Sequence, residues 1–317
     1  MRAMLRNTRL TAFAWLAFAS ACGTPRDDEP GRLVVYTAGS LARPVRAALD
    51  SFAAQHNVQY DLESAGSLET ARKLTELNKI PDVIALADED VFPKLLVPRH
   101  ATWYARFARN RMVIAYSERS RYAAELNEGN WRDVLTRSGV QVGRSNPDLD
   151  PSGYRTLLVF QLAERLYNDA GLAERLESNA PPRNMRAKEA ELVALVEAGE
   201  LDYAWQYESL ARAVGHRYLP LPRAIDLSAT SDSATYATAS VRVVGAAPGD
   251  TITMVGRPIR YAVSIPSAAP HAELAERFVA WLLSAQGRAT LRAEHLDALD
   301  TAEFAGTGTP PGVRLPQ

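Results

Sequence analysis

Two copies of the tetrapeptide Ala-Gly-Ser-Leu lie in the first quarter of the chain, at residues 38–41 and 65–68. Each copy follows a strand-like run and precedes a run with the apolar spacing of a helix. Ser40 and Ser67 therefore lie where a helix begins, and a helix begins with backbone N–H groups that have no partner within it. Two such turns, each with a neutral hydroxyl donor, could bind one oxyanion between them.

An ordinary structural role is the alternative at each copy. Serine is a common N-cap, and glycine beside it is typical of turns. A single Gly-Ser before a helix would be interpreted as a cap. Two copies in the same strand–turn–helix context make an anion site an equal alternative.

Residues 143–155 are the most distinctive segment, with two prolines, two glycines and two acids just before an expected helix. Ser152 and the glycine after it would add a third group of N–H donors. Asp148 and Asp150 would repel an anion at the same place. Glu189 presents the same difficulty, although an acid in a first helical turn is favoured by the helix dipole alone.

Strands alternate with helices along the chain, which predicts an α/β fold of mostly parallel sheets flanked by helices. Ligands of such sheets bind beyond the carboxyl ends of the strands, where both Gly-Ser turns lie. The expected strands are 33–36, 83–86, 111–116, 201–205 and 259–265. The expected helices are 41–52, 71–77, 154–170, 189–198, 209–214 and 272–284.

The chain of 317 residues, 47% of them hydrophobic, is long enough for two lobes that each have a core. We expect it to cross between lobes near residue 116 and to return near residue 259. Lobe I would then comprise 32–115 and 260–317, and lobe II would comprise 116–259. Residues 226–257 are rich in small polar residues and predict a surface hairpin or loop, and the proline-containing tail is not expected to be regular.

The N-terminus has the layout of a secretory signal, with arginines, an apolar stretch at 10–19 and small residues at 19–21. The apolar stretch is too short to span a membrane. Cys22, the only cysteine, follows directly and excludes a disulfide within the chain. Its position resembles the lipidated cysteine of bacterial lipoproteins, although Ala19 stands where leucine is usual, and ordinary signal cleavage is the alternative. We expect a signal at 1–22, a tether at 23–31 and a location in the periplasm or on the extracytoplasmic face, anchored by lipid at Cys22.

Composition and motifs argue against other function classes. The net charge of −1 and the absence of a basic stripe disfavour nucleic-acid binding. The five histidines have no metal-ligand spacing, and no Gly-x-Ser-x-Gly elbow surrounds Ser40 or Ser67. We therefore do not expect an enzyme. A secreted serine hydrolase remains the alternative of another class, since a triad can assemble from distant positions.

The chain resembles the extracytoplasmic molybdate/tungstate-binding proteins of ABC importers, especially their tungstate-binding branch. The similar segments are 36–41, 64–67, 143–155 and 188–207, in order within about residues 32–300. The resemblance implies a two-lobed periplasmic-binding-protein fold of type II with two crossover segments. It also implies molybdate or tungstate as ligand, no cofactor, and delivery to a permease and its ATPase. We expect a monomer.

The resemblance implies two groups of site residues. Those expected to contact the oxyanion are Ser40, Ser67, Ser152 and Tyr207, and those expected to reach the metal are Asp150 and Glu189. Ser152 stands where that branch often has cysteine, and Ala187 stands where proline is common, but neither departure removes a proposed ligand. Asp148 remains an alternative to Asp150, because the two lie in one loop.

The acids make physical sense in that light. Two carboxylates would strongly disfavour a dianion in a poorly solvated cleft. A hexavalent metal that accepts hard oxygen ligands and expands from tetrahedral coordination turns this repulsion into bonding. Sulfate and phosphate cannot expand in this way, so the acids would select against them. A general receptor for tetrahedral oxyanions is the alternative, and the sequence does not separate molybdate from tungstate.

Overall fold

The structure is a computed structural model that describes residues 32–246 and 249–314. The expected signal segment and tether, Cys22 included, lie outside the described residues. Residues 31–317 form one compact unit. In the ranges that the structure describes, no helix has both the length and the hydropathy needed to cross a bilayer.

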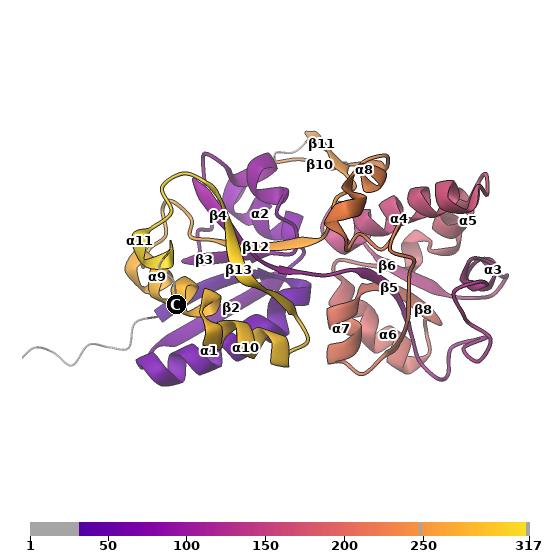
Figure 1. Ribbon diagram of the computed structural model, residues 1–317, viewed down its shortest axis with the longest axis horizontal. Coiled ribbons are helices and arrows are strands. Elements are labelled where there is room, and N and C mark those ends of the chain that lie inside the picture. The colour runs from indigo at the N-terminus through magenta and orange to yellow at the C-terminus, as the bar shows by residue number, and fades with distance from the viewer. Residues whose placement is uncertain (1–31, 247–248, 315–317) are drawn as a thin grey trace, which may run out of the picture. The chain divides into compact units, whose positions relative to one another are not determined.

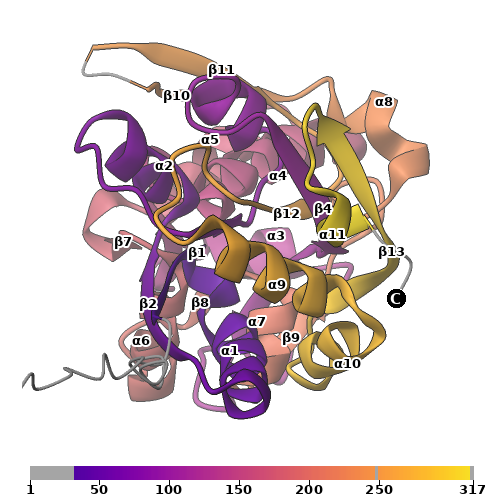
Figure 2. The same ribbon diagram turned by 90° about the vertical axis from the view of Figure 1, so that its left-hand side faces the viewer.

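A six-stranded sheet organises the first lobe, with the strand order β13-β4-β12-β3-β1-β2. β1 pairs in parallel with β2 and β3, whereas β12, β4 and β13 add antiparallel pairs. The strands are β1 Arg32–Ala38, β2 Gln59–Ala65, β3 Val83–Leu86, β4 Trp103–Arg109, β12 Arg260–Ser264 and β13 Asp297–Gly306. The helices are α1 Ala42–His56, α2 Ser67–Thr75, α9 Ala272–Leu283, α10 Ala285–Ala293 and α11 Pro311–Arg314. In Figure 2, α1, α9 and α10 lie toward the viewer.

A five-stranded sheet organises the second lobe, with the strand order β7-β6-β8-β5-β9. β6 is parallel to β7 and β8, and β5 is antiparallel to β8 and β9. The strands are β5 Met112–Tyr116, β6 Val142–Ser145, β7 Met185–Arg186, β8 Tyr203–Tyr207 and β9 Arg217–Pro220. The helices are α3 Trp131–Thr136, α4 Pro151–Tyr167, α5 Leu172–Asn179, α6 Leu192–Ala198 and α7 Glu208–Ala213. Figure 1 shows the two lobes side by side. The expected α/β class with two helix-flanked sheets is confirmed.

The chain passes from the first sheet to the second between β4 and β5 and returns before β12. The strand expected at 111–116 is present as β5, but both of its edges pair within the second sheet, so the first crossing precedes this strand. Before the return come α8 Ser233–Tyr236 and a hairpin of β10 Ser240–Val244 with β11 Thr251–Val255. This hairpin lies in the segment where the sequence predicts one.

The pairing of β1 with β2 aligns the two Ala-Gly-Ser-Leu copies, because Ala38 lies opposite Ala65. Ser40 then falls in a 3₁₀ turn, Gly39–Leu41, and Ser67 is the first residue of α2. Neither hydroxyl makes a helix-capping hydrogen bond. The capping explanation for the repeat is therefore wrong, and the hydrogen bonds of both hydroxyls are made outside their own helices.

Aromatic side chains pack against one another in the core of each lobe. In the second lobe the ring of Trp205 on β8 meets Trp131 of α3 at 5.9 Å and Phe160 of α4 at 5.0 Å between centroids. In the first lobe Phe52 of α1 meets Phe278 of α9 at 5.3 Å. Edge-to-face pairs of this kind add to the free energy of burying the rings. The loops at the strand ends are thus mounted on two well-packed supports.

Gly153, in the first turn of α4, provides a stability test. A Cβ at this position would lie 2.5 Å from the carbonyl oxygen of Ser145 and 2.6 Å from the nitrogen of Pro147. Both are backbone atoms, so the loop between β6 and α4 must shift to admit a methyl group. We expect Gly153→Ala to lower the free energy of unfolding by about 1–3 kcal/mol, measured by urea denaturation of the ligand-free protein. Gly312→Ala is the control, because a Cβ there has no neighbour within 4 Å, and equal losses in both variants would contradict the prediction.

Candidate functional site

Two sets of parallel strands end at the seam between the lobes. In the first lobe, β2, β1 and β3 lead into Ser67, Ser40 and the residues that follow Leu86. In the second lobe, β7, β6 and β8 lead toward Glu189, Asp150 and Tyr207. Carboxyl ends of neighbouring parallel strands lie at one edge of a sheet, which is where open α/β sheets bind ligands.

Backbone N–H groups join the two acids and Tyr207 in the second lobe. The N–H of Glu189 donates to Oδ2 of Asp150 at 2.8 Å, and the N–H of Tyr207 donates to Oε2 of Glu189 at 3.0 Å. Asp150 is also the N-cap of α4, with the nitrogen of Ser152 3.4 Å from its Oδ1. All four residues are buried. The structure therefore brings together the four second-lobe residues that the sequence singled out.

Polar atoms without partners mark the same place. Oε1 of Glu189 and the hydroxyls of Ser145 and Ser152 are buried and have no hydrogen-bond partner in the described residues. Glu189 is 0% exposed. A buried carboxylate oxygen without a partner costs free energy, because it has lost its hydrogen bonds to water and gained none in the protein. Such a group in a native fold indicates a missing partner at this position.

The pKa values of both acids are shifted upward in this buried environment. Burial raises the pKa of Glu189 well above its usual value, and the carboxylate of Asp150 raises it further. Burial also raises the pKa of Asp150 to about 6, although the N–H groups of Glu189 and Ser152 act in the opposite direction. Both shifts have the sign expected for buried carboxyl groups that share a site. A cationic or electron-accepting partner would lower the free-energy cost of keeping these buried carboxyl groups charged.

The first lobe supplies hydroxyl groups whose oxygens are already accepting. Oγ of Ser67 accepts the N–H of Ala87 at 3.0 Å, and Oγ of Ser40 lies 3.2 Å from the hydroxyl of Tyr261. A serine hydroxyl has one hydrogen to donate beyond the bonds that its oxygen accepts. Ser40 and Ser67 can therefore both act as donors into the seam.

Arg155 of α4 links the two halves and is fully buried in its guanidinium region, with 4% of its side chain exposed. Its Nη1 donates to the carbonyl oxygen of Ala87 at 2.7 Å and to the hydroxyl of Tyr207 at 2.6 Å. Its Nη2 lies 3.2 Å from Oδ1 of Asp88. One cation of the second lobe thus holds the carbonyl oxygen of Ala87, the residue whose N–H donates to Ser67.

A second link joins Tyr207 to the region of Ser40. The rings of Tyr207 and Tyr261 meet edge to face with centroids 5.8 Å apart. The hydroxyl of Tyr261 then reaches Ser40. All six residues expected at the site are buried, and contacts across the seam link Ser40 and Ser67 to the second-lobe cluster.

Asp148 lies outside this cluster. Its Oδ1 accepts the N–H of Val244 at 3.0 Å, and its carbonyl oxygen accepts Arg72 at 2.6 Å. The carboxylate of Asp148 therefore fastens the β10–β11 hairpin to the loop before α4. Of the two acids in that loop, Asp150 is the one beside Glu189.

The N-terminus of α2 differs from what the sequence suggested. The N–H groups of Leu68 and Glu69 donate to the carbonyl oxygen of Leu149 at 3.1 and 3.3 Å. A Cβ on Gly66 would lie 2.1 Å from the same oxygen. These two N–H groups are thus occupied by a peptide of the facing lobe, which leaves the hydroxyl and the N–H of Ser67 as the donors at this helix end in the described residues.

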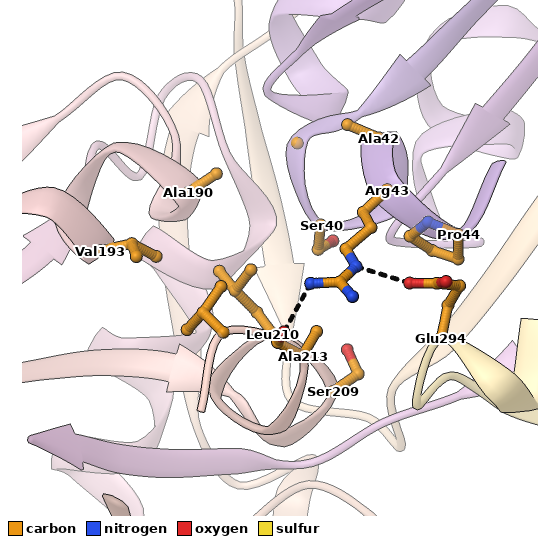
Figure 3. A pocket seen from close by; sticks show the side chains of 12 residues that line it. Ser40, Ala42, Arg43, Pro44, Ala190, Val193, Ser209, Leu210, Ala213 and Glu294 are labelled. Atoms are coloured by element: carbon orange, nitrogen blue, oxygen red, sulfur yellow. Dashed lines mark hydrogen bonds and ion pairs between the residues drawn. The ribbon is translucent and has the colours of Figure 1, made fainter. Parts of the chain in front are cut away.

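A cavity of about 210 Å³ adjoins the seam beside Ser40 (Figure 3). Arg43 extends across it, with Nε 2.5 Å from Glu294 in the first lobe and Nη1 2.5 Å from the carbonyl oxygen of Ala213 in the second. Most of its other lining residues are apolar, among them Val193 and Leu210. The lining of this cavity is thus mostly apolar, whereas the buried cluster carries carboxyl and hydroxyl groups.

Sequence reasoning missed several residues of this region. Arg155 stands at the end of the distinctive segment 143–155, so its place beside a helix start with two acids was a usable signal. Asp88 and Tyr261 follow or lie within strands and carry no motif of their own. Their roles depend on contacts between segments far apart in the chain.

Comparisons with known proteins agree with this architecture. The family of bacterial extracellular solute-binding proteins matches residues 33–296. An uncharacterized solute-binding protein of Petrotoga mobilis is 42% identical over 282 residues, which cover 88% of each chain. The molybdate/tungstate-binding protein WtpA of Pyrococcus abyssi is 33% identical over 303 residues, which cover 87% of each chain.

Solved structures confirm the fold. The sulfate-binding protein SubI of Mycobacterium tuberculosis superposes with a TM-score of 0.59 at 13% identity, over 85% of this chain and 88% of that one. At this identity the likeness concerns the arrangement of the two lobes, which is that of periplasmic-binding proteins of type II. The chain belongs to the family of bacterial extracellular solute-binding proteins.

Proposed function

We propose that this protein binds molybdate or tungstate outside the cytoplasm and delivers it to an ABC permease with its ATPase. The observation that carries the proposal is the unpartnered Oε1 of buried Glu189, beside Asp150 and among neutral donors. The relative from Pyrococcus abyssi, named for both anions, supports the same ligand class.

In this proposal each lobe has its own role. Four hydroxyl groups donate to the oxo groups of the anion, those of Ser40, Ser67, Ser152 and Tyr207, because the N–H groups of Ser152 and Gly153 already bond to Asp150. The two acids bond to the metal, which accepts hard oxygen ligands. The bonds from the carboxylates to the metal offset the free-energy cost of burying two negative charges side by side.

Hydrogen phosphate is the second candidate within a general oxyanion receptor. It carries a proton that Oε1 of Glu189 could accept, so the unpartnered oxygen fits it as well. Sulfate has no proton at neutral pH and would meet the two acids with repulsion alone. The comparison among these anions is therefore decisive.

A serine hydrolase is disfavoured by the partners of the two serines. Among the described contacts, Ser40 meets a tyrosine and Ser67 meets a backbone N–H, and neither hydroxyl touches a histidine. A nucleophilic serine needs an adjacent base within hydrogen-bond reach. The family, a group of solute-binding proteins, points the same way.

Closure of the lobes would couple binding to transport. A ligand held by both lobes favours the closed state by its differential affinity for that state. The permease would recognise this closed form. We further propose that the protein is a monomer, held at the extracytoplasmic face of the membrane by lipid on Cys22.

The first prediction concerns selectivity. Isothermal titration calorimetry is expected to show tight binding of tungstate and molybdate and at least about 100-fold weaker binding of sulfate and phosphate, because neither of the latter has a metal centre that can accept the carboxylates as ligands. Equal affinity for phosphate would favour the general receptor, and equal affinity for sulfate would contradict any role of the acids as metal ligands.

The second prediction concerns the acids. Glu189→Gln keeps an acceptor for the N–H of Tyr207 but replaces the free carboxylate oxygen by a donor. We expect tungstate binding to weaken roughly 100-fold and sulfate binding to strengthen, with Asp150→Asn changing in the same directions. Asp148→Asn is the matched control, since its contact to Val244 lies away from the cluster. Tighter tungstate binding in Glu189→Gln would show that the acid only repels.

The third prediction tests closure. In Gly66→Ala the new methyl group would meet the carbonyl oxygen of Leu149 in the facing lobe, at 2.1 Å. We expect tungstate affinity to fall by about tenfold or more, with little change in the melting temperature of the ligand-free protein. Small-angle X-ray scattering should show contraction on tungstate addition in the wild type but less in the variant. A full contraction with unchanged affinity would contradict this.

A further inference from the structure

Asn110 lies at the crossing between the lobes, between β4 and β5, and is buried. Its Oδ1 accepts the N–H groups of Arg111 at 2.9 Å and Ser209 at 3.3 Å. Its Nδ2 lies 2.6 Å from Oγ of Ser209 and 2.8 Å from the hydroxyl oxygen of Tyr261. A backbone N–H can only donate, so these two bonds identify the oxygen of the amide and leave the nitrogen facing Tyr261.

The hydrogen bond between Tyr261 and Ser40 also has a defined direction. An amide NH₂ can only donate, so the oxygen of Tyr261 accepts from Asn110. Tyr261 is fully buried, and burial raises the pKa of its hydroxyl so that it keeps its proton. Within the described residues Ser40 is the other hydrogen-bond partner of that hydroxyl, at 3.2 Å. Tyr261 therefore donates to Ser40.

Ser40 is the last member of this chain of bonds. Its oxygen accepts from Tyr261, and its own hydrogen has no acceptor among the residues that the structure describes. The hydrogen is left for the seam, where the anion is expected. Molybdate and tungstate present oxo groups without hydrogen, which only accept hydrogen bonds.

We propose that Asn110 is a positioning residue that makes Ser40 a fixed hydrogen-bond donor to the bound oxyanion, acting through Tyr261. This inference rests on the proposed function for its ligand, but the direction of the bonds is a property of the protein alone. A serine without such a relay could turn its hydrogen away and present a lone pair to an oxo group.

Asn110 contacts both lobes, so the relay of hydrogen bonds from Asn110 through Tyr261 to Ser40 depends on both. Ser209 belongs to α7 of the second lobe, whereas Tyr261 lies on β12 of the first. The N–H and hydroxyl of Ser209 hold the amide in the orientation that the relay needs. The donor on one lobe is thus oriented by contacts from the other.

Asn110→Asp is the informative substitution, because a carboxylate of the same size only accepts. The proton of Tyr261 would turn toward Asp, and Ser40 would then donate to Tyr261 and face the anion with a lone pair. We expect tungstate affinity in calorimetry to fall by about 10- to 100-fold. The added negative charge would contribute to this loss, so a second variant is needed.

The double variant Asn110→Asp/Tyr261→Phe separates the causes. Without the phenol oxygen, Ser40 has no acceptor on that side and its hydrogen is free for the anion again. The proposal predicts that the double variant binds tungstate at least about fivefold more tightly than Asn110→Asp alone, with Tyr261→Phe alone as the reference. A merely structural role, or an effect of charge alone, predicts no recovery, and that result would overturn the proposal.

Neutron diffraction on deuterated crystals of the wild-type protein tests the relay without a ligand. The deuterium between Tyr261 and Ser40 is expected on Tyr261, and the deuterium of Ser40 is expected to point into the seam. A deuterium of Ser40 directed at Tyr261 would overturn the relay. If the wild type bound neither molybdate nor tungstate, the proposed function would fail, while the neutron map would still decide the direction of these bonds.

Discussion

The burial of two carboxylates side by side is the constraint on which the site depends. Asp150 and Glu189 are withdrawn from water, joined through a backbone N–H, and left with one oxygen that no described group satisfies. Burial raises the pKa values of both acids, and the charge of Asp150 raises the pKa of Glu189 further. Buried acids with raised pKa values cluster at functional sites. In the proposed function, the metal of the bound oxyanion accepts both carboxylates as ligands.

In the proposed function, each lobe contributes a different kind of group to ligand recognition. The first lobe offers hydroxyls mounted on aligned turns after β1 and β2, and these carry no formal charge. The second lobe offers the acids and a tyrosine after β7, β6 and β8. Neutral donors alone bind any tetrahedral dianion, and the acids would then separate one anion from another.

The seam between the lobes is held by groups that also orient the site. Arg155 ties the peptide of Ala87 to Tyr207, and Asn110 ties Ser209 to Tyr261. Each donates a hydrogen bond to a phenol oxygen. In the proposed function, the same contacts that join the lobes would also direct hydroxyl hydrogens toward the ligand, with the amide and the guanidinium as donors.

The sequence by itself determined the α/β class, the position of β3 at Val83–Leu86, the turns at Ser40 and Ser67, and the acids as an anomaly. These follow from local pattern, since apolar period, glycine and proline act over a few residues. Only the tertiary structure decided that β5 joins the second sheet, that the two serines do not cap helices, and that Asp150 rather than Asp148 lies beside Glu189. It also assembled Asp88, Asn110, Arg155 and Tyr261 around the site. Those outcomes depend on contacts between distant segments, and no short-range pattern encodes which buried partner a polar side chain will meet.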